Sequence, residues 1–294
     1  MRIVSDSPRV VSFDDGQTYT IYPQYTPTIK SASVTQTDTA TGKVTVKWQP
    51  WLDTAGVTFG KLYGKGPSDT AFSLLKDSIR APDSTYQHDS LNTQTANHQY
   101  YLTAIDSCGF ASDSASIHKT MDLTFEVGQL SHKLQWTPYQ GLPVQNYLVQ
   151  RKQGNRFITL DSLPAGDTAI TKYPEPCNVP ISYRIKAIDS NGNFSYSDTG
   201  IREAIDTIPP NSADFTNTTV IKDSVLKVTF QGADSLDIFA YDLMRKQDTG
   251  NFQLAERIIF DSAGGSFTVY DTLKTAKDRL CYQILTQDSC LNTV

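Results

Sequence analysis

The stretch YRIKAIDSNGNFSYSDT, Tyr183–Thr199, occurs three times in the chain in recognisable form. An earlier copy reads YYLTAIDSCGFASDS, Tyr100–Ser114, and a fainter one reads CYQILTQDSC, Cys281–Cys290. Each copy starts near a tyrosine and continues with mostly apolar side chains at every second position, which predicts a strand with one buried face. The Asp-Ser pair and the residues after it are typical of a turn. The repeat is therefore expected to be a strand followed by its hairpin turn.

A second strand is expected upstream of each copy, and it carries a large core aromatic residue. KVTVKW, HKLQW and LKVTF end at Trp48, Trp136 and Phe230, at nearly equal intervals before the three tyrosines (48 to 100, 136 to 183, 230 to 282). Two more matching segments lie between them in each copy: FGKLYGKG and STYQHDSL, YLVQRKQGNRF and AITKYPEP, YDLMRKQDTGNF and SFTVYDTL. A unit of roughly 90 residues with short alternating strands and frequent turns predicts a β-sandwich.

The expected fold class is therefore all-β, with three tandem immunoglobulin-like sandwiches at 27–120, 121–207 and 208–294. Residues 1–26 are expected to be the tail of a preceding β domain or a linker, with QTYTIYPQY a strand. DTIPPN, Asp206–Asn211, predicts a linker because its two prolines cannot extend a ladder. Ser116–Val127 has no such break and predicts a strand that continues between units. The third unit lacks its last strand at Val294, so the natural protein is expected to extend further.

The motifs together resemble fibronectin type III domains of the bacterial kind over roughly residues 27–294. They are the tryptophan of the second strand, Y-x-V/L-x-R in the third and Y-R-I-x-A-I-D-x-x-G-N-x-S in the sixth. The tyrosines of the repeated strand resemble a tyrosine corner, whose phenol bonds nearby backbone. TGKVTVKW, IHKTMDLTFEV and LQWTPYQGL are similar to tandem arrays in Bacteroidota surface proteins.

This resemblance implies a non-catalytic structural and interaction array, acting as a spacer in a secreted or cell-surface bacterial protein. The narrower similarity implies a type IX secretion substrate or a gliding-associated protein. Implied partners are other domains of the same polypeptide, outer-membrane or secretion-system proteins, and glycans. An adhesin or carbohydrate-binding segment is one alternative, and an accessory region of an extracellular hydrolase is another. Fold alone does not choose among them.

Composition excludes two classes of partner. The net charge is −5 and the basic residues form no block, which argues against nucleic acid. The chain has no run of about 18 apolar residues, so no membrane insertion is expected. Residues 1–25 also lack the apolar core of a secretory signal.

No catalytic, cofactor-binding or metal-ligating residue is predicted. DSNGN, Asp189–Asn193, resembles the start of a calcium loop, but Gly200 stands where a bidentate Glu is needed, which favours a hairpin turn. GKLYGKG, Gly60–Gly66, departs from a phosphate-binding loop and favours a glycine-rich strand. The four histidines do not fall at metal-ligand spacing; they are His88, His98, His118 and His132. A carboxylate pair for sugar hydrolysis could still assemble in space.

Trp51 and Tyr139 each follow a core tryptophan by three residues, in WQPW and WTPY. Interdomain packing is the favoured role for both, because large aromatic side chains are more often buried than displayed. A sugar-stacking platform is the alternative.

The four cysteines allow few pairings. Cys281 and Cys290 are separated by a strand and are too far apart to bond, and Cys108 and Cys290 belong to units two apart in the array. Cys177 and Cys290 could meet across the junction of the second and third units. Four unpaired thiols, or partners outside this segment, are the favoured alternative.

Overall fold

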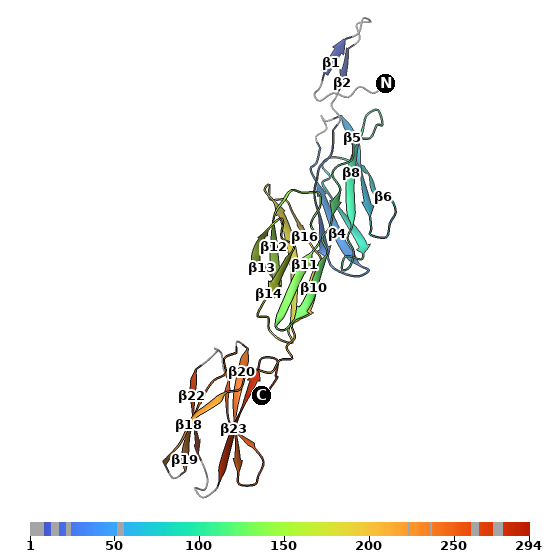
Figure 1. Ribbon diagram of the computed structural model, residues 1–294. Helices are drawn as coiled ribbons and strands as arrows, with labels where there is room; N and C mark the ends of the chain where they lie inside the picture. Colours follow the sequence, from blue (N-terminus) through green and yellow to red (C-terminus); the bar gives the residue numbers. More distant parts are fainter. Residues whose placement is uncertain are drawn as a thin grey trace. The chain divides into compact units, whose positions relative to one another are not determined.

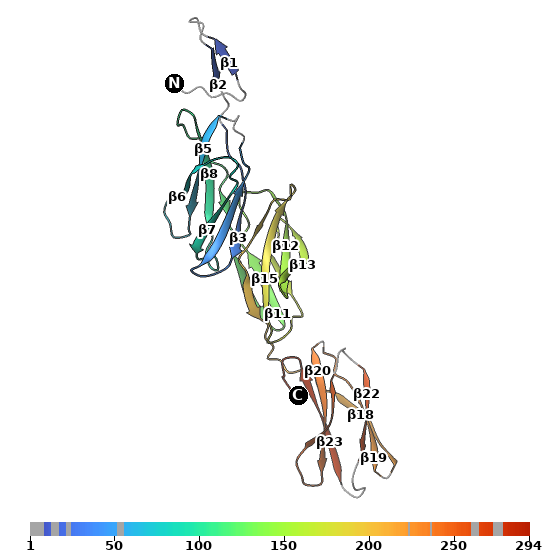
Figure 2. The ribbon, with the colours of Figure 1, turned by 180° about the vertical axis from the view of Figure 1, so that it is seen from behind.

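The computed structural model describes residues 9–12, 18–21, 25–51, 56–222, 224–235, 237–259, 265–272 and 279–294. In these ranges every regular element is a strand, and none of the described segments is a helix that could cross a membrane. The strands form pairs of sheets that Figures 1 and 2 show from two sides. The chain is therefore all-β and built of tandem β-sandwiches, as its alternating pattern predicts.

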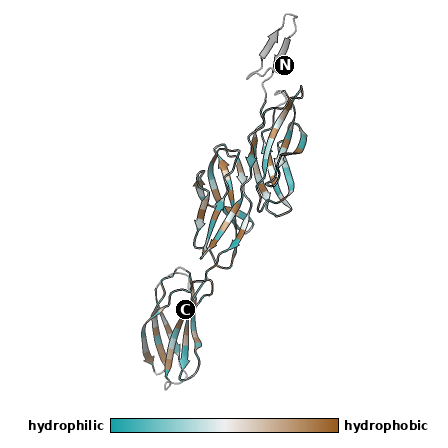
Figure 3. Cartoon of the chain, turned by 45° about the vertical axis from the view of Figure 1, so that its right-hand side comes forward, coloured by the Kyte–Doolittle hydropathy of each residue, from teal (hydrophilic) through white to brown (hydrophobic). Residues whose placement is uncertain are grey.

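The first sandwich packs a three-stranded sheet, β3-β4-β7, against a four-stranded sheet, β6-β5-β8-β9. Val44, Val46 and Trp48 of β4 are buried as predicted, and they pack with Leu62 and Tyr100 of the other sheet. Buried and more exposed side chains alternate along β4. Figure 3 shows the matching alternation of hydrophobic and hydrophilic residues as brown and teal stripes along the strands. The bounds are β3 (Ile29–Gln36), β4 (Gly42–Trp48), β5 (Val57–Lys65), β6 (Ser73–Ile79), β7 (Thr85–Leu91), β8 (Gln99–Asp106) and β9 (His118–Lys119).

The second sandwich repeats this arrangement with sheets β10-β11-β14 and β13-β12-β15-β16, and β17 also pairs with β15. Trp136 and Tyr183 lie in its core, on the faces that the sequence predicts. The bounds are β10 (Leu123–Gly128), β11 (Ser131–Trp136), β12 (Val144–Gln153), β13 (Arg156–Pro164), β14 (Ala169–Lys172), β15 (Pro180–Asp189), β16 (Phe194–Tyr196) and β17 (Gly200–Glu203).

The third sandwich has two three-stranded sheets, β18-β19-β22 and β21-β20-β23. Val228 and Phe230 are fully buried in its core. Near the end of the chain, Gln287 of β23 forms an isolated antiparallel β-bridge with Thr293. The bounds are β18 (Asp214–Lys222), β19 (Val225–Gln231), β20 (Ile238–Gln247), β21 (Gln253–Ile259), β22 (Ser266–Thr272) and β23 (Leu280–Asp288).

A hairpin of β1 (Arg9–Ser12) and β2 (Thr18–Ile21) precedes the sandwiches, so a strand does form in QTYTIYPQY. The other residues of 1–24 lie outside the described ranges. By contacts the chain divides into two compact units. The first comprises 1–126, 133–171 and 181–202, and the second 127–132, 172–180 and 203–294. The division cuts the range predicted for the second sandwich, because two of its loops contact the residues that follow β17.

The strand predicted to run through Ser116–Val127 is interrupted. β9 ends at Lys119 and β10 begins at Leu123. Between them, Thr120 donates its backbone N–H to the carbonyl of His98 and accepts the backbone N–H of His98 on its hydroxyl. These bonds close the first sandwich and end the strand. The predicted linker Asp206–Asn211 contains no strand, as expected.

The tyrosine-corner expectation is wrong for two of the three tyrosines. The Tyr100 phenol lies 3.1 Å from His88 Nδ1, and the Tyr282 phenol donates to Asp271 at 2.6 Å. Both partners are side chains of the facing sheet rather than nearby backbone. Within the same sandwich, the phenols of Tyr147 and Tyr241 accept backbone N–H groups. These two tyrosines lie on β12 and β20, the strands that pair with the repeated strands β15 and β23.

The repeated turn has the same hydrogen bonds in all three sandwiches. Asp106, Asp189 and Asp288 each accept, on one carboxylate oxygen, the backbone N–H groups two and four residues later. The carboxylate thus supplies the acceptors that the turn needs. The shared Asp therefore folds the same turn in each unit.

The third turn carries backbone strain that its sisters avoid. Leu291 has φ 71°, where Gly109 and Gly192 have 81° and 80°. A side chain is disfavoured in this region, and Leu291 is 65% exposed, so little burial offsets the cost.

Leu291→Gly is therefore expected to raise the free energy of unfolding of the third sandwich by about 0.5–1 kcal/mol, after the entropy lost by glycine. Urea unfolding measures the change. The reciprocal variant Gly192→Leu is the control, because a Cβ at Gly192 would meet no atom within 4 Å and only the backbone penalty should appear. Equal stability of Leu291→Gly and wild type would contradict the strain.

Candidate functional site

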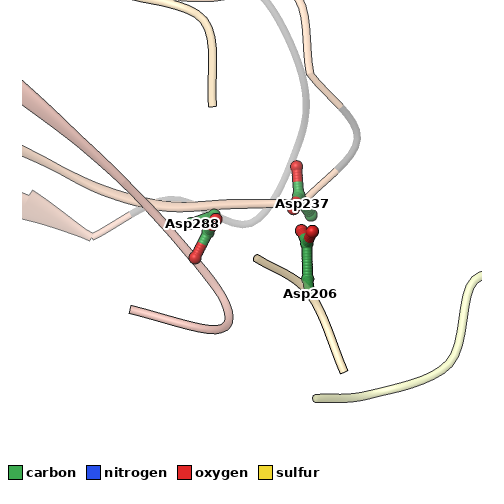
Figure 4. Close-up of side chains that lie close together, drawn as sticks. All are labelled: Asp206, Asp237 and Asp288. Atoms are coloured by element: carbon green, nitrogen blue, oxygen red, sulfur yellow. The ribbon is translucent and has the colours of Figure 1, made fainter. Parts of the chain in front are cut away.

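Three aspartates from different elements gather at one end of the third sandwich. Asp206 follows β17, Asp237 directly precedes β20, and Asp288 ends β23. One carboxylate oxygen of each lies within 4.8 Å of the others, and Figure 4 shows Asp206 and Asp237 directed toward each other. Sequence reasoning missed this group, because the three residues share no spacing. The only local signal is that Asp288 belongs to the repeated turn.

Hydrogen bonds hold each of these carboxylates in place. Asp288 is fully buried and accepts from the Asn292 side-chain amide at 2.8 Å in addition to the turn N–H groups. Asp206 accepts from the backbone of Ile208 at 2.9 Å, and Asp237 accepts from the Ser235 hydroxyl. The Asp group is thus part of the packing that closes this end of the sandwich.

Burial raises the pKa of Asp206, and the neighbouring carboxyl groups of Asp237 and Asp288 raise it further, while the Ile208 N–H lowers it. Two arrangements relieve repulsion of this kind: a shared proton, or a hard cation that takes one oxygen from each residue. Among the described residues, these three aspartates are the ones placed closely enough together to hold a metal ion.

A disulfide joins Cys177 to Cys290 beside this group, with Cα atoms 5.3 Å apart. The favoured prediction, four unpaired thiols, is therefore wrong for this pair, and the less favoured pairing is present. The reason is the path of the linker. Cys177 forms an isolated parallel β-bridge with Ala204, and the Asn292 side chain donates a hydrogen bond to the Asp206 carbonyl at 3.1 Å. These contacts bring the turn of Cys290 to the loop of Cys177.

The other two cysteines, Cys108 and Cys281, are exposed and form no disulfide. A bond from Cys281 to Cys290 does not form, as the strand length predicts. Cys108 occupies the same turn position as Cys290, yet its thiol is free.

The two loops weighed as ligand sites have the favoured structures. Asp189 accepts from Asn193 through both backbone and side chain, so DSNGN is a hydrogen-bonded hairpin turn. GKLYGKG lies largely within β5, which pairs on both sides, so it is a strand.

The histidines are separated rather than gathered around a metal. His88 bonds Tyr100, His98 lies 2.8 Å from the Asn92 carbonyl, and His118 lies 2.8 Å from the Tyr139 phenol. His132 is fully buried. Among the described residues, the side chains grouped closely enough to hold a metal ion are Asp206, Asp237 and Asp288, and none of the four histidines lies with them.

Trp51 and Tyr139 are both buried, at 4% and 5% exposure, so neither ring is displayed for sugar stacking. Trp51 packs in the core of its own sandwich. Tyr139 belongs to the second sandwich, and its phenol accepts the backbone N–H of Ala32 in the first at 2.8 Å. The predicted interdomain role is thus confirmed for Tyr139. Trp51 is buried as expected, in the core of its own sandwich, and an interdomain role for it stays a prediction.

The contact of Tyr139 is one of several that join the first and second sandwiches within the first compact unit. The Ser195 hydroxyl donates to the Ala32 carbonyl at 2.7 Å, and Tyr196 donates its backbone N–H to the Ser33 hydroxyl at 2.9 Å. Thr199 donates to the Thr37 hydroxyl at 2.7 Å. We call these bonds, with those of Tyr139 and His118, the β3–β16 junction.

His118 is neutral in this junction. Burial lowers its pKa to about 4, although a backbone hydrogen bond with Ile29 opposes the shift. Gly141 makes room for the ring, because a Cβ there would lie 2.4 Å from His118. The junction is therefore packed to contact as well as hydrogen-bonded.

A half-exposed aromatic face lies on the outer side of β5 and β8. Tyr63 and Tyr101 stack with centroids 4.8 Å apart, and Phe72 meets Tyr101 edge-on at 4.8 Å. Lys65 lies 5.8 Å from the Phe72 ring. These tyrosine rings combine a large apolar surface with a polar hydroxyl at its edge.

No protein-family model matches the chain, and no curated protein matches it. Among solved structures it is similar to the FN1-FN3 domains of chicken CNTN1, at 12% identity over 91% of this chain and 97% of that chain, with a TM-score of 0.25. It is also similar to the central fibronectin-III array of RIM-binding protein, at 11% identity over 91% and 94%, with a TM-score of 0.25. The fold is assigned from the strand order alone.

Proposed function

We propose that this chain is a non-catalytic structural and interaction array that acts as a spacer in a secreted or cell-surface bacterial protein. Its partners are then other domains of the same polypeptide and proteins of the outer membrane or secretion system. The resemblance of its motifs to Bacteroidota arrays supports a type IX secretion substrate or gliding-associated protein. A spacer needs joints that resist bending rather than reactive side chains.

The β3–β16 junction is the observation that carries this proposal. The bonds of Tyr139 with Ala32 and His118, and that of Ser195 with Ala32, are buried, and the first of them satisfies a backbone N–H of the other sandwich. Such bonds are costly to break, because water cannot replace the lost partner without opening the packing. The junction therefore opposes independent movement of the first two sandwiches.

The disulfide supports the extracellular part of the proposal. Structural disulfides form and persist in oxidising compartments and are rare where thiols are kept reduced. The Cys177–Cys290 bond joins residues 113 positions apart, so it cross-links folded elements and not a local loop.

Tyr139→Phe tests the spacer role. It leaves the Ala32 N–H buried without its acceptor, and is expected to weaken the junction by about 1–3 kcal/mol. Spin labels on Thr70→Cys and Asp167→Cys, both exposed positions, report the distance between the two sandwiches in a Cys108→Ser/Cys281→Ser background. We expect a narrow distance distribution that broadens in Tyr139→Phe.

Tyr241→Phe is the matched control, because its phenol accepts the backbone N–H of Ala233 in the third sandwich, away from the β3–β16 junction. Its distribution should stay narrow. A broad distribution in the parent protein would overturn the spacer role.

Carbohydrate binding is the second candidate, and the aromatic face of Tyr63 and Tyr101 favours it. A glycan array followed by titration tests it on the whole chain. Saturable binding that Tyr63→Ala abolishes supports an adhesin or carbohydrate-binding segment. Binding that this variant leaves unchanged removes the aromatic face from consideration.

A further inference from the structure

We propose that the Cys177–Cys290 disulfide carries tension past the third sandwich, so that residues 178–289 stay out of the mechanical path of the chain. This bypass deepens the proposed spacer function and rests on it for its biological meaning. Its physical content is the covalent path alone.

The disulfide encloses a long and continuous part of the fold. Cys177 lies in the loop between β14 and β15, and Cys290 lies in the turn after β23. Everything from β15 to β23 is therefore enclosed between the two sulfur atoms. A pull along the chain reaches Cys177, crosses the disulfide, and continues from Cys290.

The folded structure keeps this bypass short. The two Cα atoms are 5.3 Å apart, and Asn292 is bonded to the carbonyl of Asp206. The linker after β17 is held by the loop between β10 and β11. Leu130 donates its backbone N–H to the Ile205 carbonyl at 2.8 Å, and Gln129 both donates to and accepts from Thr207. The entry to the third sandwich and its last turn are thus held at one place.

The bypass separates two roles. The covalent path of tension runs through the first sandwich and strands β10 to β14 and passes by β15 to β23. Of the bypassed strands, β15 is still hydrogen-bonded to β12, whereas the third sandwich is not paired with any loaded strand among the described residues. The third sandwich can then unfold or stay folded under load without changing the length of the spacer. Its surfaces remain available for contacts when the chain is pulled.

Single-molecule pulling of the whole chain, tethered at its two ends, tests this. An extended residue spans at most about 3.6 Å, so the 113-residue separation removes roughly 400 Å from the full extension of the oxidised protein. Dithiothreitol should restore that length. It transfers two electrons and two protons to the bond, giving two thiols, and becomes the cyclic disulfide itself.

Cys177→Ser/Cys290→Ser should reach the longer extension with or without reductant. Cys108→Ser/Cys281→Ser should keep the shortfall, which shows that no other cysteine pair causes it. An oxidised parent protein that reaches its full length overturns the bypass. So does a shortfall that persists in dithiothreitol. Either result leaves the spin-label test of the β3–β16 junction untouched, so failure of the bypass is distinct from failure of the spacer role.

Discussion

Replacing Cys177 and Cys290 together with serine is expected to lower the free energy of unfolding of the third sandwich by about 4 kcal/mol. The bond closes a loop of 113 residues, and such a cross-link reduces the conformational entropy of the unfolded chain. The folded contacts around it remain, because the turn of Asp288 is hydrogen-bonded independently of the sulfur atoms. The loss should therefore appear as easier unfolding of a structure that is otherwise unchanged.

Hydrogen exchange measured by mass spectrometry locates this effect. The three tryptophans lie in the first two sandwiches, so their fluorescence does not report the third. A loss of about 4 kcal/mol corresponds to roughly a thousandfold faster exchange in β19 and β20. Exchange in β4 and β5 should not change. Cys108→Ser/Cys281→Ser is the matched control and should exchange at the parent rate; less than a tenfold change in the bridge variant would contradict the prediction.

The cores and the turns were predictable from sequence because they depend on local patterns. Alternation places Trp48, Trp136 and Phe230 on buried faces whatever the neighbouring strands do. The turn depends on one Asp and the backbone that directly follows it. Both features repeat three times, which makes the pattern easy to recognise.

The candidate site was not predictable, because its members meet only through the path of the linker. Asp206, Asp237 and Asp288 come from three segments, and nothing in their spacing sets the direction in which the linker leaves β17. The prolines after Asp206 show that a strand ends, but not where the chain goes next. The disulfide depends on the same path, so the sequence leaves it as one alternative.

The prediction of the hydrogen-bond partners of the repeated tyrosines was wrong for a related reason. A tyrosine on a buried face can satisfy its phenol with backbone or with a side chain of the opposite sheet. His88 and Asp271 occupy matching strands, β7 and β22, and supply that side chain. Period two gives the face of a residue but not the register of the strands opposite.

Asp198 is expected to make the second sandwich less stable as pH rises. It is 1% exposed and accepts the backbone N–H of Leu123 at 2.7 Å, at the start of β10. Burial raises its pKa to about 8, and the neighbouring Asp122 raises it further, whereas the Leu123 N–H lowers it. The folded state thus keeps a proton that the unfolded state releases near its usual pKa of 3.8.

The sign follows from this difference in proton binding. The contribution of Asp198 to stability is complete below the unfolded pKa and is lost as pH rises through about 8. His118 acts in the opposite direction, because its pKa is lowered to about 4 and its contribution is lost as pH falls. His118 is present in both a variant of Asp198 and the parent protein, so its effect cancels when their free energies of unfolding are subtracted at each pH.

The free energy of unfolding of Asp198→Asn, relative to that of the parent protein, should therefore rise by on the order of 3 kcal/mol between pH 5 and pH 8. The asparagine oxygen still accepts the Leu123 N–H, and its amide cannot ionise, so the cost of a buried charge disappears. Urea unfolding at several pH values, followed by tryptophan fluorescence, measures the difference in free energy. A difference between Asp198→Asn and the parent that stays constant from pH 5 to pH 8 would mean that Asp198 is ionised in the folded protein throughout this range.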